Sequence, residues 1–531
     1  MAAAKQEISD LDKSSGTISV VQELDSEQNR LGSNPISTVE DTWKPAKWRR
    51  MLAVVWDTFE LPPGERQYVQ RLDFFIFSYS LLSYVVKYLD QGNVSNAYVS
   101  GMQEDARNEN LFTTFFNIGY LIGSFPTQVI MTRIRPSYFI PSCEVLWGIL
   151  VMTLAAANNA KTIYGIRFVV GLCEATVFPG FMWILGSWYY PSQLAKRMAL
   201  FECSSSAAGM FSGYIQTGAY AHMNGLYGIA GWRWAFILDG IISIPIACMG
   251  YYCLPDFPTT TQARWLNKEQ RAYGVARMAK LGRKPPKKFT LQRLGGFFFS
   301  LRPWVFCIPY NIGNFGSSYS YFNLWLKATG RYSVEQINIL PTAGNAISIV
   351  VTYSFSLLSD ITRRRATFAF AATVIPFFTN ICLAVWNISF NFKLAVNLIN
   401  YAGWSYQPVL NAWASEAFQD DAEMRGLMIG MGNTINYAMN AWLPLVLFPT
   451  TEAPVYKYGY KFSAGFYGIE LVSIPMFYLF VKWDHKRRGK VINKYGLAID
   501  RDDLDYSESD TVKEIVDIEK GSHHVVTVHE I

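Results

Sequence analysis

Long apolar runs constrain this chain more than any other feature. Runs of about 20 residues fill two blocks, and the charged residues crowd into 1–71, 256–302 and 482–531. The hydrocarbon core of a bilayer is about 30 Å thick, and a helix of about 20 apolar residues crosses it. Half of the residues are hydrophobic and 17% are charged, whereas about 25% are charged in soluble domains. The sequence therefore predicts an all-α, multi-pass membrane protein.

The apolar runs number twelve and fall into two sets of six, separated by a polar loop. They lie near 72–91, 110–131, 137–157, 162–184, 198–221, 232–254, 303–326, 336–358, 366–386, 392–414, 426–448 and 462–482. This pattern predicts twelve transmembrane helices in two pseudo-symmetric six-helix halves. The expected organisation is a largely disordered tail (1–71), a first bundle (72–254), a basic linker (255–302), a second bundle (303–482) and a C-terminal tail (483–531).

Lysine and arginine placement predicts the orientation. Basic residues gather in the linker, at 363–365 and after the last run, which all lie on the side of the N-terminus when the spans are even in number. Positive loops face the cytoplasm, so both termini are expected there. The plasma membrane is the expected location, and a monomer is the expected working form. The net charge is +6, and the basic residues lie in loops that flank the spans, so no nucleic acid partner is expected. Without a Walker loop, nucleophile elbow or metal-ligand cluster, the sequence indicates neither an enzyme nor a cofactor.

Four charged residues in spans one and four are the main candidates, because an ionisable group inside a span is costly and is a functional candidate by default. Lys87 and Asp90 share one face of the first span, and Arg167 and Glu174 share one face of the fourth. Helical rise puts Asp90 and Arg167 at similar depth, with Lys87 and Glu174 deeper. If the two helices adjoin, Asp90 can pair with Arg167 while Lys87 lies nearer Glu174. Protonating either acid would then free a base to attract an anion.

The alternative is that these four residues are structural ion pairs between helices. Three further acids in spans, Glu144, Glu202 and Asp239, are interpreted as structural.

Polar side chains in spans seven and ten are candidates for substrate contact because polar residues in spans usually face the bundle interior. The candidates are Tyr310, Asn314, Asn400, Gln407 and Asn411. A mixed hydrogen-bonding cavity suits a hydroxylated or amide-bearing organic acid, and the alternative is hydrogen bonding between helices. A separate loop cluster of Asp360, Arg363 and Arg364 is expected to act in gating.

Several motifs resemble those of major facilitator transporters. Arg167 followed by Gly171 is similar to their span-four signature, and Asp360 followed by Arg363 to Arg365 is similar to a loop signature of their second half. More closely, the chain resembles the anion:cation symporter family, in its fungal allantoate permease branch. The segments that carry this resemblance are residues 87–97, 186–190, 231–234, 255–258 and 441–444.

The resemblance implies roles for particular residues. In that family the span-one Asp and the span-four Arg and Glu serve proton coupling and anion binding, which implies these roles for Asp90, Arg167 and Glu174. The family commonly has Arg directly after the span-one Asp, whereas this chain has Gln91, so Lys87, one turn earlier, is the candidate replacement. The pattern over residues 87–102 is similar to the vitamin-transporting subgroup whose members carry pantothenate.

Together these features predict proton-coupled uptake of a small organic anion, with pantothenate first. Two alternatives stay open: an efflux carrier of the same fold, and a nutrient sensor that binds without transporting.

Overall fold

The computed structural model describes residues 45–102, 109–131, 133–279, 296–418, 422–488, 491–492 and 498–499. The chain divides into two units, residues 1–74 and 75–531. In the first unit, α3 spans Lys47–Val55, a 3-10 turn spans Asp57–Phe59, and α4 spans Pro63–Leu72. Pro63 begins α4, where its missing N–H costs nothing.

The second unit contains the membrane-spanning helices, which group into twelve consecutive passes within the described residues. The first six are α5 (Ser78–Ala97), α7 (Glu109–Met131), α8 (Pro136–Thr153), α9 with α10 (Ala160–Glu174 and Val177–Trp188), α11 (Pro191–Met223) and α12 (Gly231–Cys253). The linker carries α13 (Lys268–Ala279). The last six are α15 with α16 (Leu301–Phe315 and Phe322–Thr329), α17 (Val334–Thr362), α18 (Arg365–Val385), α19 with α20 (Phe390–Asn400 and Tyr406–Ala417), α21 with α22 (Ala422–Asn440 and Leu443–Leu447) and α23 (Gly459–Arg488). Two two-residue strands, β1 (Val491–Ile492) and β2 (Ala498–Ile499), pair antiparallel after the last pass.

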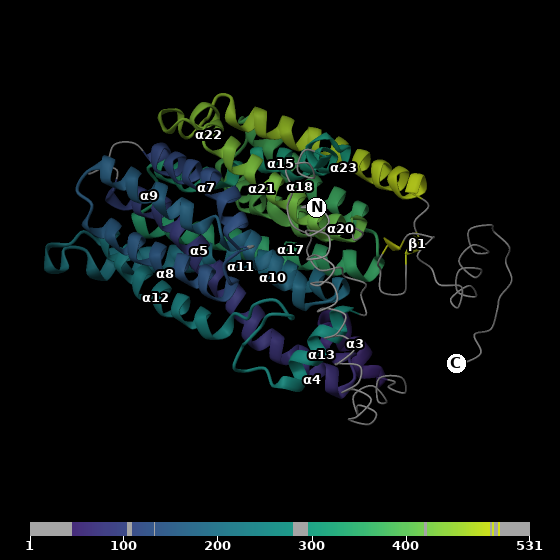
Figure 1. The fold of residues 1–531 in the computed structure, drawn as a ribbon. Coiled ribbons are helices and arrows are strands. Elements are labelled where there is room, and N and C mark those ends of the chain that lie inside the picture. The colour runs from purple at the N-terminus through teal and green to yellow at the C-terminus, as the bar shows by residue number, and fades with distance from the viewer. Residues whose placement is uncertain are drawn as a thin grey trace, which may run out of the picture. The chain divides into compact units, whose positions relative to one another are not determined.

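The same helix pairings occur in both halves. The first pass packs on the fifth (α5 on α11) as the seventh packs on the eleventh (α15 on α21), and the third packs on the sixth (α8 on α12) as the ninth packs on the twelfth (α18 on α23). Figure 1 shows α8 and α12 side by side. Since each pairing recurs six passes later, the predicted architecture of two pseudo-symmetric six-helix halves is confirmed.

Helix irregularities occur on passes one, four, seven and ten, and also on pass eleven, where α21 and α22 are separate helices. A π-helical turn at Tyr98–Met102 follows α5, residues 175–176 separate α9 from α10, and 3-10 turns at Ser318–Tyr321 and Tyr401–Ser405 interrupt passes seven and ten. Non-helical backbone at membrane depth is tolerated where it is buried in protein or lines a cavity. The interrupted passes are therefore the place to look for a binding site.

The seam between the halves is lined by small and polar residues. It is formed largely by α11 packing on α17. A methyl group at Gly213 would lie 2.5 Å from the Asn338 carbonyl oxygen, so the two backbones approach too closely for any larger residue. Ser206 Oγ donates to Ser348 Oγ across the same seam at 3.1 Å.

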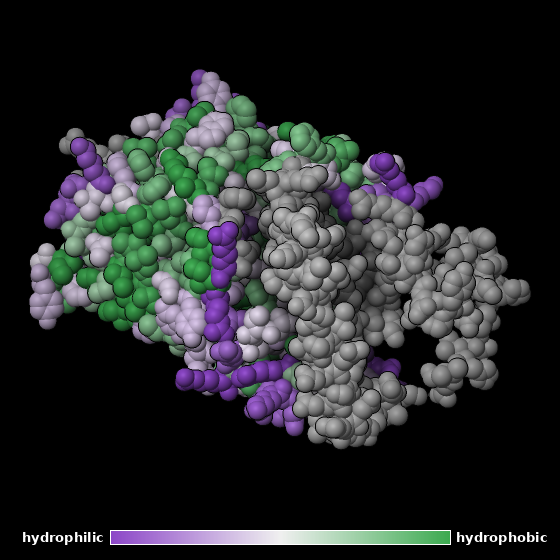
Figure 2. Space-filling view, in the orientation of Figure 1, coloured by the Kyte–Doolittle hydropathy of each residue, from purple (hydrophilic) through white to green (hydrophobic). Residues whose placement is uncertain are grey.

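Large hydrophobic side chains cover the outside of the bundle. Leu146 and Ile149 on α8, and Ile241 and Met249 on α12, are exposed, and Figure 2 shows hydrophobic residues over this part of the visible face. Among the residues that the structure describes, seven helices are long and apolar enough to cross a membrane by length and composition alone. In a broken pass such as α15 with α16, neither helix is long enough to cross a membrane by itself. The apolar outer face is the surface expected against lipid.

Candidate functional site

A small cavity lies between the two halves, with irregular passes in its wall. It is lined by Tyr84, Lys87, Tyr88, Phe178, Glu202, Tyr310, Trp404, Gln407, Asn433, Asn436 and Tyr437. Its volume is about 30 Å³, enough for about two water molecules. The cavity is thus too small for an organic molecule in this conformation and has to widen before one enters.

Lys87 is the cation of this cavity. Only 1% of its surface is exposed, and its Nζ lies 5.0–5.9 Å from the centres of four tyrosine rings, those of Tyr84, Tyr88, Tyr120 and Tyr437. Nζ donates a long hydrogen bond of 3.5 Å to Tyr437 Oη. Within the described part of the chain, Lys87 forms no salt bridge. The negative faces of the rings stabilise the ammonium group, while its acidic neighbours Glu174 and Glu202 lie beyond salt-bridge distance.

The predicted charged cluster gathers beside this cavity, although its direct pairs do not form. Asp90, Glu174 and Arg167 are fully buried electrostatic neighbours. No donor group bonds either carboxylate oxygen of Asp90, and no acceptor bonds Nε and Nη1 of Arg167; the carboxylate of Asp90 lies within hydrogen-bonding range of that of Asp239. Glu174 Oε2 instead accepts a 2.8 Å hydrogen bond from Gln91 Nε2. Gln91 is the residue that stands where the family commonly has Arg. The cluster keeps polar atoms open rather than closing into ion pairs.

Asp239 adds a third acid to this cluster. It lies on α12, is fully buried, and is a charged neighbour of Asp90. Its Oδ2 accepts from Asn93 Nδ2 at 2.8 Å and its Oδ1 from Ser243 Oγ at 3.2 Å. Asn93 Oδ1 in turn accepts from Ser212 Oγ at 2.7 Å. Two helices, α12 and α5, therefore meet at a carboxylate that is held by neutral donors and faces another acid.

A close helix contact positions Arg167. A methyl group at Gly171 on α9 would lie 2.2 Å from the Phe116 carbonyl oxygen, and one at Gly119 on α7 would lie 2.1 Å from that of Phe168. Only glycine fits at such distances, so α7 and α9 touch backbone to backbone. One helical turn from Gly171, the Arg167 guanidinium lies over the Phe116 ring, 4.5 Å from its centre.

The polar candidates of the second half separate into two groups. Tyr310 and Gln407 line the cavity. Gln407 Oε1, Asn314 Oδ1 and both polar atoms of the Asn411 side chain are buried without a hydrogen-bond partner. Asn400 differs, because its amide is fully engaged. It accepts from Thr379 and Asn380 at 2.9 and 3.0 Å and donates to Ser318 at 2.7 Å, as expected of a residue that joins helices.

The loop cluster forms around Arg365. This residue bonds Asp360 and also pairs with Glu416 at 2.5 Å. Arg363, in a left-handed conformation with φ of 57°, and Arg364 are both exposed. The sequence thus located the cluster, and the structure gives the interior position to the third arginine.

Sequence reasoning missed several cavity residues. Glu202, interpreted as structural, lines the cavity, has Lys87 as a charged neighbour, and accepts a long 3.4 Å hydrogen bond from Trp404 Nε1. Asn433, Asn436 and Tyr437 on α21 also line it. Their spacing of three and four residues places them on one helix face, a signal that was present in the sequence.

A two-halved bundle with buried charges around a central cavity defines a membrane carrier, since ionisable groups inside a membrane mark pathways for ions and substrates. Residues 80–444 match the family model described as Major Facilitator Superfamily. The chain belongs to this superfamily, and is therefore a multi-pass transporter and not an enzyme.

Individual relatives support the assignment. The chain is 36% identical over 402 residues to "MFS transporter PfmaC" of Pestalotiopsis fici, covering 74% of this chain and 76% of that protein. It is 30% identical over 418 residues to "Pantothenate transporter liz1" of Schizosaccharomyces pombe, covering 77% and 80%. Among solved structures, a D-xylose-proton symporter has the same fold, with a TM-score of 0.58, 13% identity, and coverage of 76% of this chain and 97% of that one.

Proposed function

We propose that this transporter carries a small organic monocarboxylate inward together with protons, and that pantothenate is the first candidate. The observation that carries the proposal is Lys87, a buried cation on the wall of the central cavity without a salt bridge in the described residues. A buried charge is costly unless it is paired. A carboxylate entering the cavity supplies the direct ion pair that Lys87 lacks, and the phenol of Tyr437 beside Nζ supplies a hydrogen bond to it.

Acids outnumber bases around the cavity, which favours proton coupling. Lys87 and Arg167 are the two bases, and the acids are Asp90, Glu174, Glu202 and Asp239. Ionising all four acids would leave an uncompensated double negative charge out of water, at a cost of several kcal/mol per ion. Protons on the acids relieve this cost. Proton loss toward the side of low acidity would then restore competition for Lys87 and Arg167 and release the substrate.

The inferred cycle assigns distinct roles to the predicted residues. Asp90 and Glu174 take up protons, Arg167 holds the cluster, and Lys87 binds the carboxylate. Tyr310, Asn314, Gln407 and Asn411 contribute hydrogen bonds to the uncharged part of the substrate, and the loop cluster with Asp360 acts in gating. A relative named as a pantothenate transporter supports pantothenate as the first candidate. We further propose a plasma-membrane monomer with both termini in the cytoplasm.

The test is uptake of labelled pantothenate by cells that lack their own carrier, at pH 5 and pH 7, with and without an uncoupler. The proposal expects saturable uptake that is faster at pH 5 and collapses when the gradient is removed. Surface labelling confirms that the protein reaches the membrane. Absence of uptake from correctly located protein would reject pantothenate, and uptake indifferent to pH and uncoupler would reject proton coupling.

A further inference from the structure

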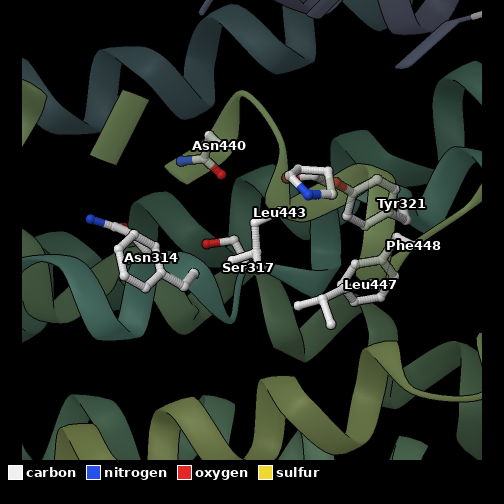
Figure 3. A pocket seen from close by; sticks show the side chains of 10 residues that line it. Asn314, Ser317, Tyr321, Asn440, Leu443, Leu447 and Phe448 are labelled. Atoms are coloured by element: carbon white, nitrogen blue, oxygen red, sulfur yellow. The ribbon is translucent and has the colours of Figure 1, made fainter. Parts of the chain in front are cut away.

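A second cavity lies in the C-terminal half, separate from the one around Lys87. Its volume is about 50 Å³, and it is lined by Asn314, Phe315, Ser317, Ser320, Tyr321, Asn440, Leu443, Pro444, Leu447 and Phe448. Figure 3 shows that its two ends differ. The side chains of Asn314, Ser317 and Asn440 gather at one end, and those of Tyr321, Leu447 and Phe448 at the other. A group that fits this cavity carries a hydrogen-bonding atom next to a short apolar portion.

One face of α21 connects the two cavities. Asn433 and Asn436 line the cavity around Lys87, and Asn440 lines the second. Their spacing of three and four residues places the three amides on one helix face, over about 10 Å at 1.5 Å per residue. Asn440 Nδ2 donates to Asn436 Oδ1 at 2.7 Å, so the polar face is continuous from one cavity to the other.

The second cavity also has unused hydrogen-bonding capacity. Asn314 is 4% exposed, its Nδ2 is bonded to the Tyr310 carbonyl oxygen, and its Oδ1 has no partner. An unpartnered buried acceptor raises the free energy of the folded protein, because the acceptor has lost water and gained nothing. A hydroxyl or amide N–H of a bound molecule would remove that penalty. Asn314 thus favours a ligand that donates a hydrogen bond at this end of the cavity.

We propose that this second cavity is the subsite for the substrate tail. It would select elongated monocarboxylates whose far end bears a hydroxyl donor beside a short branched alkyl group. This inference rests on the proposed function, since the carboxylate is placed at Lys87. The substrate then lies along the asparagine face of α21, with its tail between Asn440 and Asn314. The residues that set selectivity belong to α15, α21 and the segments that follow these two helices, while Lys87, which holds the charge, belongs to α5.

Two ligands separate the tail from the carboxylate. Pantothenate has a carboxylate, an amide, and a tail with hydroxyls beside a dimethyl-substituted carbon. N-acetyl-β-alanine keeps the carboxylate and the amide but lacks that tail. Dissociation constants for both are measured by isothermal titration calorimetry on the purified full chain in lipid nanodiscs, for the wild-type protein and for variants of the second cavity.

Asn440→Ala is expected to weaken pantothenate binding about tenfold, as loss of a hydrogen bond in a buried site does, and to change N-acetyl-β-alanine binding less than about twofold. Ser317→Ala, a smaller change on the facing wall, is expected to act in the same direction. Thr434→Ala is the matched control. Thr434 lies on α21, bonds the Gly430 carbonyl oxygen within its own helix, and lines neither cavity, so this variant should bind both ligands like the wild type.

The outcomes separate the two proposals. If wild-type protein binds both ligands equally, or if Asn440→Ala and Ser317→Ala weaken both ligands to the same extent, the tail subsite is wrong and the carboxylate site stands. If wild-type protein binds neither ligand, pantothenate is rejected as the substrate and the tail subsite is rejected with it.

Discussion

Replacing Gly171 by alanine tests whether the contact between α7 and α9 positions the charged cluster. The added methyl carbon would lie 2.2 Å from the Phe116 carbonyl oxygen and 2.8 Å from the Tyr120 nitrogen. Both neighbours are backbone atoms, so no side-chain rotation relieves the contact. The helices have to separate by about 1 Å to restore an ordinary van der Waals distance. Overpacking of this kind costs about 1–3 kcal/mol.

The separation should also reduce transport. Arg167 lies one turn from Gly171 and packs over Phe116, so moving α9 shifts the guanidinium relative to Asp90 and Glu174. Displacements of about 1 Å at a functional site cost up to about a hundredfold in rate. We expect a lower melting temperature and at least about a tenfold loss of initial uptake rate, normalised to the amount of protein at the cell surface.

Gly165 on the same helix provides the control. A methyl group there meets nothing within 4 Å, so Gly165→Ala should keep wild-type uptake and gain up to about 1 kcal/mol from helix propensity. Melting is followed by intrinsic fluorescence of the purified protein. Wild-type stability and uptake in Gly171→Ala would refute the argument, and so would equal losses in the two variants.

Three further predictions concern the cavity. Lys87→Met should abolish saturable uptake. Lys87→Arg should retain part of it with a raised KM, because the charge is kept but the larger guanidinium crowds the four tyrosine rings around it. Equal uptake by the two variants would show that the charge at this position does not determine transport. Glu202→Gln should flatten the fall in uptake between pH 5 and pH 7, since a neutral amide cannot compete with the substrate for Lys87 at higher pH; a profile parallel to that of the wild type would return Glu202 to a structural role. Asn400→Ala should lower the melting temperature while leaving KM unchanged, because its amide is bonded within the protein at every atom; a selective rise in KM at wild-type stability would contradict this.

The sequence predicts the fold well because the bilayer imposes a length and a polarity on every pass. The same rule explains why charged positions stand out, since Lys87, Asp90, Arg167 and Glu174 are costly wherever they lie in a span. The depth of a charged residue along its own helix, however, does not determine which side chain it contacts on another helix. Gln91 donates a hydrogen bond to Glu174, and Asp239 on α12 is an electrostatic neighbour of Asp90. Both contacts depend on how the helices are rotated against each other.

Neutral polar residues are harder to assign from sequence. Asn400 and Asn411 lie on the same pass, yet the amide of Asn400 is fully bonded and that of Asn411 has no partner. The difference arises from neighbours on other helices, such as Thr379 and Ser318, which a single sequence does not place. Asn433 and Asn436 were detectable by helical spacing but carried no charge to draw attention to them.

The seam of α11 and α17 bears on the energy of the transport cycle. Parting a seam of large apolar side chains would cost about 25 cal/mol for each Å² brought into contact with water. Glycines such as Gly213 have no side chain to expose, and a hydrogen bond such as that between Ser206 and Ser348 exchanges for a bond to water at little net cost. The two halves can therefore be tightly closed without being deeply trapped. A low cost of parting the seam lowers the barrier between conformations, so this seam bears on how fast the carrier can cycle.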